Sequence, residues 1–238
     1  MTARRARSEH PRNLLTSLAL VFPLLIIYQV GVLFTLPMLN GADFLTVLLF
    51  RNLGFSKGQY LAFVAAVLVL FVVGLGVLRR KQPFNPRLFF PVMLESTIYA
   101  LSMGSLIILV MTKLLGIPPR LAGALEHQSV FGRLIMSLGA GVYEETVFRL
   151  GLLGGIVALS EKVLGLARPF ALLVAFSVSS LAFSAMHHIP PYGDPISLGV
   201  FTFRALAGVC FGLLFWFRGF AVAVYTHALY DVYVLLIR

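Results

Sequence analysis

Long apolar stretches, separated by short polar segments, run along the whole chain. Most of them approach the roughly 20 apolar residues that an α-helix needs to cross a bilayer, so each is predicted to be a membrane-spanning helix. We therefore expect an all-α, polytopic transmembrane helical bundle of about seven spans, within a range of about six to eight. A shorter apolar piece at 44–50 is expected to lie at the membrane interface. The predicted spans are 14–36, 60–78, 88–115, 130–160, 169–188, 198–217 and 220–238.

The composition also indicates a membrane protein. Hydrophobic residues make up 59% of the 238 residues and the mean hydropathy is +0.94, which is more apolar than a soluble globular domain needs to be. The net charge of +10 does not indicate nucleic-acid binding, because much of the excess lies in short segments that flank apolar stretches. This positive-inside pattern predicts a multi-pass protein of the plasma membrane, with a cytosolic N-terminus and contacts to lipid head groups. The basic residues concerned are Arg4, Arg5, Arg7, Arg12, Arg79, Arg80, Lys81 and Arg87.

The stretch 141–149 places three charged side chains inside an otherwise apolar segment. A charge at membrane depth costs at least a few kcal/mol, so such residues usually serve a function. Glu145 and Arg149 are four residues apart, which puts them on one helical face and predicts an ion pair. Glu144 points about 100° away from Glu145 and is predicted to stay free to act as a base. The alternative is a buried ion pair that only fixes helix packing.

Polar residues recur at the end of the fifth predicted span and within the last one. His187 lies four residues after Phe183, on the same helical face, whereas His188 lies on another face. His227 and Asp231 are also four residues apart and are expected to point into one cavity. Alternatively, His187 and His188 are interfacial residues at a helix end. The alternative for His227 and Asp231 is a structural hydrogen-bonded pair between helices.

Three other residues in apolar stretches are expected to be structural. Glu95 has no polar neighbour at helical spacing and is predicted to have a structural or gating role. Arg204 lies near the start of its span and is predicted to extend toward the interface. Cys210 is the only cysteine, which excludes an intramolecular disulfide and a cysteine-rich metal site.

The polar residues at depth are the types that water activation inside a bilayer requires. A carboxylate takes a proton from water, a neutral imidazole shares that proton, and further donors stabilise an oxyanion. A pump or exchanger could use the same residues as a proton relay.

Three spaced motifs, each in an apolar stretch, resemble those of the CPBP family, the CAAX-protease and bacteriocin-processing group that is also called Abi or type II CAAX prenyl endopeptidase-like. The resemblance covers about residues 130–238, while the first three predicted spans contribute no motif. We therefore expect three parts: a basic cytosolic tail at 1–13, N-terminal transmembrane helices at 14–129 and, as the resemblance implies, a catalytic helical core at 130–238. The motifs are Glu144-Glu145-x-x-x-Arg149, Phe183-x-x-x-His187 and His227-x-x-x-Asp231.

The resemblance implies an intramembrane endopeptidase that hydrolyses a peptide bond near the membrane surface. By analogy, Glu144 activates water together with His187, and Arg149 orients Glu145. His227 and Asp231 form the oxyanion side. Members of the family often have Asn at the last position, and an ionised Asp has no hydrogen to donate to an oxyanion. Asp231 is therefore also a candidate for orienting His227 or for binding a metal.

Whether the site needs a metal is left open by the sequence. Glu144, His187, His227 and Asp231 are of the types that bind zinc, and a divalent metal is the alternative to a cofactor-free site. There is no H-E-x-x-H signature, and we favour glutamate-type water activation because the Glu-Glu pair needs no ion. If both helices cross fully, His187 and His227 would be too far apart, so the loop 189–197 is expected to dip into the protein.

The principal functional prediction is thus an intramembrane protease whose substrate is a peptide or protein, lipidated or membrane-anchored. A prenylated CAAX peptide, a bacteriocin precursor and a C-terminal sorting tail are all compatible. The alternatives are a proton-coupled transporter, which the lack of an internal repeat disfavours, and a non-catalytic membrane scaffold or immunity protein.

Overall fold

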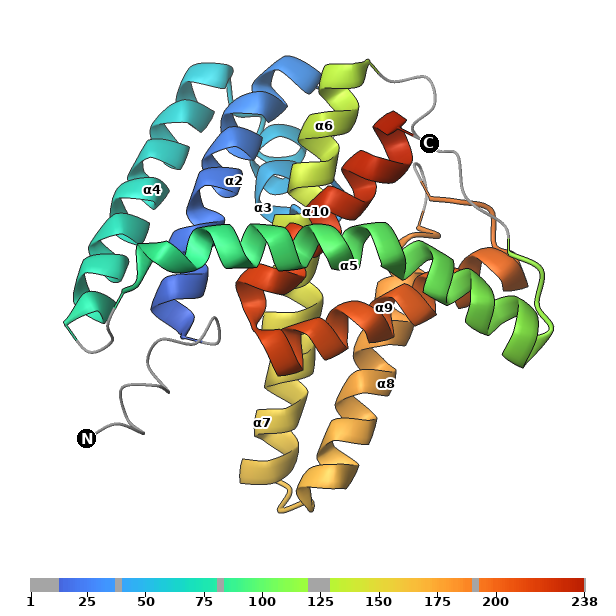
Figure 1. Cartoon of the computed structure of the whole chain (residues 1–238). Coiled ribbons are helices and arrows are strands. Elements are labelled where there is room, and N and C mark those ends of the chain that lie inside the picture. The colour runs from blue at the N-terminus through green and yellow to red at the C-terminus, as the bar shows by residue number, and fades with distance from the viewer. Residues whose placement is uncertain (1–12, 37–39, 81–83, 120–128, 190–192, 238) are drawn as a thin grey trace.

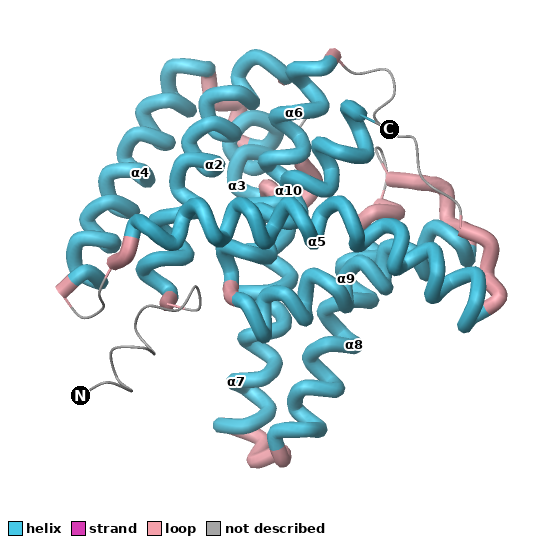
Figure 2. The backbone as a smooth tube through the Cα atoms, viewed as in Figure 1, coloured by secondary structure: helices cyan, strands magenta, loops and turns pink. Residues whose placement is uncertain are grey.

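The computed structural model describes residues 13–36, 40–80, 84–119, 129–189 and 193–237. These residues form helices joined by short loops, with no strand among them, so the predicted all-α class is confirmed (Figure 2). Most of the basic tail, Lys81 and most of the loop before residue 129 lie outside the described residues. The elements are α2 (Leu14–Thr35), α3 (Phe44–Val47), η1 (Leu48–Asn52), α4 (Lys57–Arg79), η2 (Pro86–Leu88), α5 (Phe89–Leu109), η3 (Val110–Leu115), α6 (Val130–Gly139), η4 (Ala140–Glu144), η5 (Thr146–Leu153), α7 (Gly154–Lys162), α8 (Arg168–Met186), α9 (Leu198–Arg218), α10 (Phe220–Val232) and η6 (Tyr233–Ile237).

Each of the seven predicted spans corresponds to a helical region, but these regions differ in kind. Among the described residues, five helices are long and apolar enough to cross a membrane. The last region is a shorter apolar helix, Phe220–Leu236. The predicted span at 130–160 is an α-helix interrupted by the π-helical segments η4 and η5. π-Helical turns are rare and are concentrated at functional sites, which is where the charged stretch lies.

The helices pack around α10. Figure 1 shows α2, α4 and α6 on one side of the molecule, the α7–α8 hairpin on the other, and α5 running across the middle. Helix α10 contacts α2, α5, α6, α9 and η4. All nine residues from Phe220 to Ala228 are buried, and most are small or β-branched, so several helices can approach this one closely.

A close approach between η4 and α10 depends on Gly141. A Cβ atom at this position would lie 2.7 Å from the carbonyl oxygen of Val224 and 2.8 Å from the Cβ of Ala228. Glycine therefore lets the two backbones meet. His227 lies between these two α10 contacts in the sequence, so the contact brings His227 beside the Glu-Glu pair.

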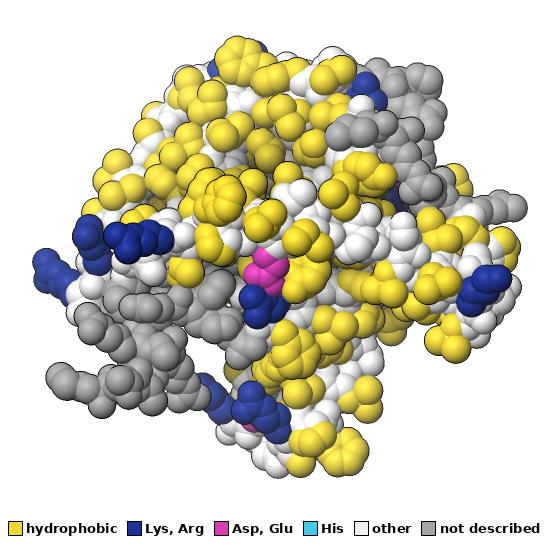
Figure 3. Space-filling view, viewed as in Figure 1, with side chains coloured by type: hydrophobic (Ala, Val, Ile, Leu, Met, Phe, Trp, Pro, Cys, Tyr) yellow, Lys and Arg dark blue, Asp and Glu magenta, His cyan; other side chains and the backbone are white. Residues whose placement is uncertain are grey.

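The outer surface is suited to lipid. Hydrophobic side chains cover most of the face in Figure 3. In α4 only Tyr60 and Val64 are buried, although the helix is strongly apolar. An apolar surface of this kind is stable when the surrounding solvent is the bilayer, and the chain is an integral membrane protein. The direction in which the N-terminus points stays a prediction.

The short apolar piece after α2 is two-sided. Thr46 and Leu49 are buried, whereas Phe44 and Leu48 are exposed. The buried side packs under α2 and α4, with Leu49 in a cluster that includes Tyr28 and Tyr60. An interfacial position agrees with this pattern, and it stays a prediction.

Candidate active site

Glu144 lies at the end of η4 and its two carboxylate oxygens have different surroundings. Oε1 accepts a hydrogen bond of 2.9 Å from Nδ2 of Asn40. Oε2 lies 3.4 Å from Nε2 of His187 and 3.9 Å from Nε2 of His227. This second oxygen is buried and accepts no hydrogen bond from any described residue. One oxygen is therefore anchored, and the other faces two imidazoles.

Glu145 and Arg149 form the predicted ion pair. Nε of Arg149 lies 3.1 Å from Oε2 of Glu145, and both side chains have an exposed fraction of 0%. The guanidinium also donates to the carbonyl oxygen of Gly208, at 3.2 Å, and lies 4.4 Å from the ring centroid of Phe183. A buried cation over an aromatic ring gains a favourable electrostatic contact. Together these contacts hold the Glu145–Arg149 pair in one position beneath the site.

His187 follows the last residue of α8, where its ring is held by the preceding turn. Its Nδ1 lies 2.7 Å from the carbonyl oxygen of Phe183. A carbonyl oxygen only accepts, so Nδ1 carries the hydrogen and a neutral ring keeps the lone pair on Nε2, which faces Glu144. The ring of Phe183 packs against that of His187 at 4.8 Å. Phe183 therefore positions the ring of His187, through both its carbonyl oxygen and its aromatic ring.

His227 lies among the carboxylates of Glu144, Glu145 and Asp231. Its Nδ1 lies 2.7 Å from Oε1 of Glu145, and its Nε2 lies 3.7 Å from Oδ2 of Asp231. The ring stacks on Phe211 with a centroid distance of 4.3 Å and an interplanar angle of 14°. A carboxylate at one ring nitrogen and an aromatic face fix the orientation of the imidazole.

The short α8 explains how residues from different spans meet. The helical run from 130 to 162 is roughly 50 Å long, whereas α8 is about 28 Å long. Helix α8 packs along α7 and η5, and Ser179 donates to the carbonyl oxygen of Phe148 at 2.6 Å. It therefore ends partway along the longer run, beside Glu144, without crossing to the far end of that run.

The loop after α8 turns back on His187, in agreement with the expected dip, although residues 190–192 lie outside the described residues. The backbone N–H of Asp194 donates to the carbonyl oxygen of His187 at 2.8 Å. Arg204, which was predicted to extend toward the interface, forms an ion pair with the buried Asp194 of this loop, and its position relative to the membrane stays a prediction. His188 points away from the site, and its Nδ1 lies 2.9 Å from the carbonyl oxygen of Asp194.

Glu95 has a partner that helical spacing could not indicate. It pairs with Arg218, whose side chain comes from the end of α9. The pair is partly exposed and links α5 to α9, which fits the structural role that was predicted.

All six predicted site residues lie in one connected cluster, and their catalytic roles remain predictions. Asn40 was missed because a lone asparagine between two spans is common and carries no signal of its own. Phe211 was also missed, since aromatic residues in apolar helices are usually core or lipid-facing.

The four candidate metal ligands lie close together but are not arranged around a common point. Among the described residues, no three His, Cys, Asp or Glu side chains are arranged to hold a metal ion. The donor types of Glu144, His187, His227 and Asp231 suit zinc, but their present positions do not. The effect of a chelator on cleavage distinguishes glutamate-type from metal-dependent chemistry.

One known family matches the C-terminal part of the chain. Residues 126–233 match the model of the family described as type II CAAX prenyl endopeptidase Rce1-like. Over this region the chain is similar to the Rce1-like family. No curated protein and no solved structure gives a significant match.

The Rce1-like match confirms the resemblance to the CPBP proteases. In general terms the protein is an intramembrane endopeptidase of the CAAX type, which acts on a peptide or protein in the membrane. The match starts close to residue 130, where the catalytic core was predicted to begin, but the division into three parts stays a prediction.

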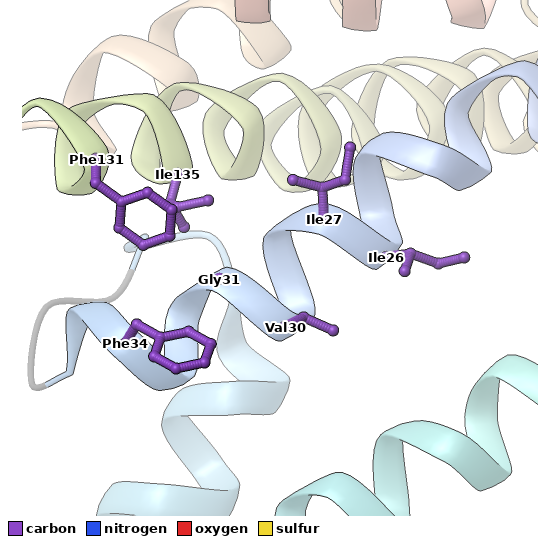
Figure 4. Close-up of a pocket in the computed structure, with 7 residues that line it drawn as sticks. All are labelled: Ile26, Ile27, Val30, Gly31, Phe34, Phe131 and Ile135. Atoms are coloured by element: carbon purple, nitrogen blue, oxygen red, sulfur yellow. The ribbon is translucent and has the colours of Figure 1, made fainter.

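Two apolar hollows lie near the Rce1-like region. Figure 4 shows an open groove of about 350 Å³ between α2 and α6, whose lining includes Val30, Phe34 and Ile135. A more enclosed pocket of about 260 Å³ lies between α2, α4 and η5 and includes the polar groups of Gln29 and Tyr143. The second pocket is the nearer to the charged stretch, because Tyr143 directly precedes Glu144.

Proposed function

We propose that the protein hydrolyses a peptide bond next to a lipidated cysteine or another membrane anchor, with Glu144 and His187 activating water. The observation that carries the proposal is the free oxygen of Glu144. It is buried, it is 3.4 Å from an imidazole nitrogen, and no described residue donates a hydrogen bond to it. A carboxylate in this state is a ready proton acceptor.

The hydrolysis runs through three proton transfers. Glu144 takes a proton from a water molecule, and the hydroxide attacks the carbonyl carbon of the scissile bond. The C–N bond then breaks, and the proton passes from Glu144 by way of Nε2 of His187 to the leaving amine. Both groups regain their starting states, so the site turns over without a cofactor.

His227 is proposed to stabilise the oxyanion. Carboxylates near both ring nitrogens attract a proton to each of them, Glu145 at Nδ1 and Asp231 at Nε2. A hydrogen on Nε2 would then be directed toward Glu144, where the tetrahedral intermediate forms. In this proposal Asp231 acts through His227, which avoids the need for an ionised carboxylate to donate a hydrogen bond.

The enclosed apolar pocket supports a lipidated substrate. Its lining includes Phe22, Phe71 and Leu150, so it would take a hydrocarbon chain. The proposed substrate is therefore a peptide with a prenyl group near its C-terminus, as the family description also suggests.

The proposal is tested by cleavage in detergent or liposomes with three probes: a prenylated CAAX peptide, the same peptide without the prenyl group, and a membrane-anchored peptide without a CAAX sequence. We expect cleavage of the prenylated peptide by the wild type and none by Glu144→Ala, with equal thermal stability. Wild-type activity that survives a chelator supports glutamate-type chemistry, while loss with the chelator supports a metal. Failure to cleave any probe would contradict the proposed substrate class.

A further inference from the structure

Asn40 contacts the site from outside the Rce1-like region. It lies in the segment between α2 and α3, 104 positions before Glu144 in the sequence. Its side-chain Nδ2 nevertheless donates to Oε1 of Glu144 at 2.9 Å. Neither the motifs nor the family match, which covers residues 126–233, assigns this residue a role.

The orientation of the Asn40 amide follows from its second hydrogen bond. The backbone N–H of Ala42 donates to Oδ1 of Asn40 at 2.8 Å. A backbone N–H only donates, so the atom that it meets must be the amide oxygen. The NH₂ group is then the one that faces Glu144. The contact is therefore a hydrogen bond from an amide to a carboxylate, in which the charge of the acceptor strengthens the bond.

The segment that carries Asn40 is anchored in the protein interior. Asp43 is fully buried and caps α3 by accepting from the backbone N–H of Thr46 at 3.0 Å. Burial raises the pKa of the Asp43 carboxyl group. The backbone N–H of Asn40 lies 3.4 Å from the hydroxyl of Tyr28, which is also fully buried. These contacts fix the backbone at the asparagine and in the residues that follow it.

A chain of polar contacts connects the same segment to the turn before Glu144. Thr46 lies 3.4 Å from the hydroxyl of Tyr60, which donates to the side chain of Gln29. Gln29 in turn donates to the hydroxyl of Tyr143. Polar groups from α2, α3 and α4 therefore meet beneath η4. In an otherwise apolar bundle, such buried polar groups must form hydrogen bonds with one another.

We propose that Asn40 is a positioning residue of the active site, which holds Oε1 of Glu144 so that Oε2 faces His187 and the substrate water. The inference rests on the proposed function, since it concerns how Glu144 acts. It makes the segment 40–47 part of the active site, although that segment lies outside the Rce1-like region.

The effect of Asn40 should appear in the chemical step. Without the amide, the carboxylate can turn about its terminal bond, and its reactive oxygen is no longer fixed. A misplaced general base lowers kcat, whereas KM changes little if the substrate does not touch Asn40. A residue that merely held the loop together would instead change the thermal stability.

The test compares Asn40→Asp with Asn40→Ala and a matched control. Asp keeps the oxygen that accepts from Ala42 but loses the NH₂ donor. The control is Asn85→Asp, because Asn85 acts as an acceptor for the N–H of Arg87, at 3.0 Å, and Asp can replace it. With the prenylated peptide as substrate, we expect kcat to fall about 10- to 100-fold in both Asn40 variants, with KM within about twofold. Asn85→Asp should match the wild type.

Each result bears on a different claim. Wild-type kcat in Asn40→Asp and Asn40→Ala, beside an inactive Glu144→Ala, would overturn the role of Asn40 and leave the proposed function intact. If Asn40→Asp does not fold, Asn40→Ala decides, and a loss confined to thermal stability with unchanged kcat would also overturn it. A wild-type protein that cleaves none of the probes would remove the proposed function, and this inference with it.

Discussion

Two glutamates that are neighbours in the sequence have opposite surroundings in the structure. Glu145 faces inward, where Arg149 and Nδ1 of His227 pair with it and no solvent reaches it. Glu144 faces the other way, where Asn40 holds one oxygen and the other approaches His187 without a hydrogen bond from the described residues. The charge of the Glu145 carboxylate is neutralised by its partners, while the Glu144 carboxylate keeps one oxygen that can accept a proton.

In this molecule the unreactive charge cluster of Glu145 and Arg149 supports the reactive group beside it. The inner cluster orients His227, and the ring of Phe183 lies against both Arg149 and His187. The fixed positions of Glu145 and Arg149 on the inner face therefore determine how the two histidines are oriented around Glu144. Variants of the two faces should accordingly differ in kind: one set loses activity and the other loses stability.

The largest effect is expected for Glu144→Gln. The amide has nearly the same shape but cannot take a proton, so cleavage should fall by about 10²- to 10⁴-fold. Thermal stability in detergent should stay close to that of the wild type. A clear fall in stability with residual activity would place Glu144 among the structural charges, like Glu145.

Arg149→Ala should be the most destabilising change on the inner face. It leaves the Glu145 carboxylate buried without its cation, at a cost of roughly 3–5 kcal/mol in the free energy of unfolding. The matched control is Arg218→Ala, which breaks the partly exposed pair with Glu95 and should cost about 0–1 kcal/mol. Thermal denaturation in detergent measures both. Equal stability of Arg149→Ala and the wild type would contradict the assignment.

Gly141→Ala should have a smaller effect on the same face. The added methyl group would lie 2.7 Å from a backbone oxygen of α10, so the helices must separate. We expect a loss of about 1–3 kcal/mol in stability, with a fall in activity because His227 moves with α10. Gly155→Ala is the control, since nothing lies within 4 Å of a Cβ atom there. Wild-type stability in Gly141→Ala would show that the close contact is dispensable.

Asp231→Asn is expected to have the smallest effect. It tests whether Asp231 acts through His227 or contacts the oxyanion itself. If Asp231 acts only by attracting a proton to His227, the neutral amide should lower kcat by up to about tenfold. If the position instead donates to the oxyanion, the amide should maintain or raise kcat. Steady-state kinetics on the prenylated peptide separate the two roles, with Asn85→Asp again as the unaffected reference.

Much of this arrangement follows from local rules that a sequence carries. Hydrophobic length predicted the helices, and spacing of four residues predicted the pair of Glu145 with Arg149 and the proximity of His227 to Asp231. The confirmed pair forms although the backbone there is partly π-helical, because both residues still lie on one face.

The remainder depends on contacts between distant segments. The partner of Glu95 comes from α9, and the partner of Arg204 comes from the loop after α8. Asn40 approaches Glu144 only because the segment after α2 folds inward over buried Asp43 and Thr46. No periodicity within one segment reports such a contact, since it depends on how helices pack and where a loop turns.

The π-helical turn η4 contains about one residue more than a regular α-helical turn would. The wider turn accommodates this residue locally, so the helical stretches on its two sides keep nearly the relative rotation of a regular α-helix. Loss of one residue from 140–143 would therefore leave the packing of Gly139 on Tyr28 and the approach of Glu144 to His187 nearly in place. In a regular α-helix such as α8, the same loss would rotate one half of the helix by about 100° against the other. The chain should accordingly tolerate a single deletion more easily at this turn than in its regular helices.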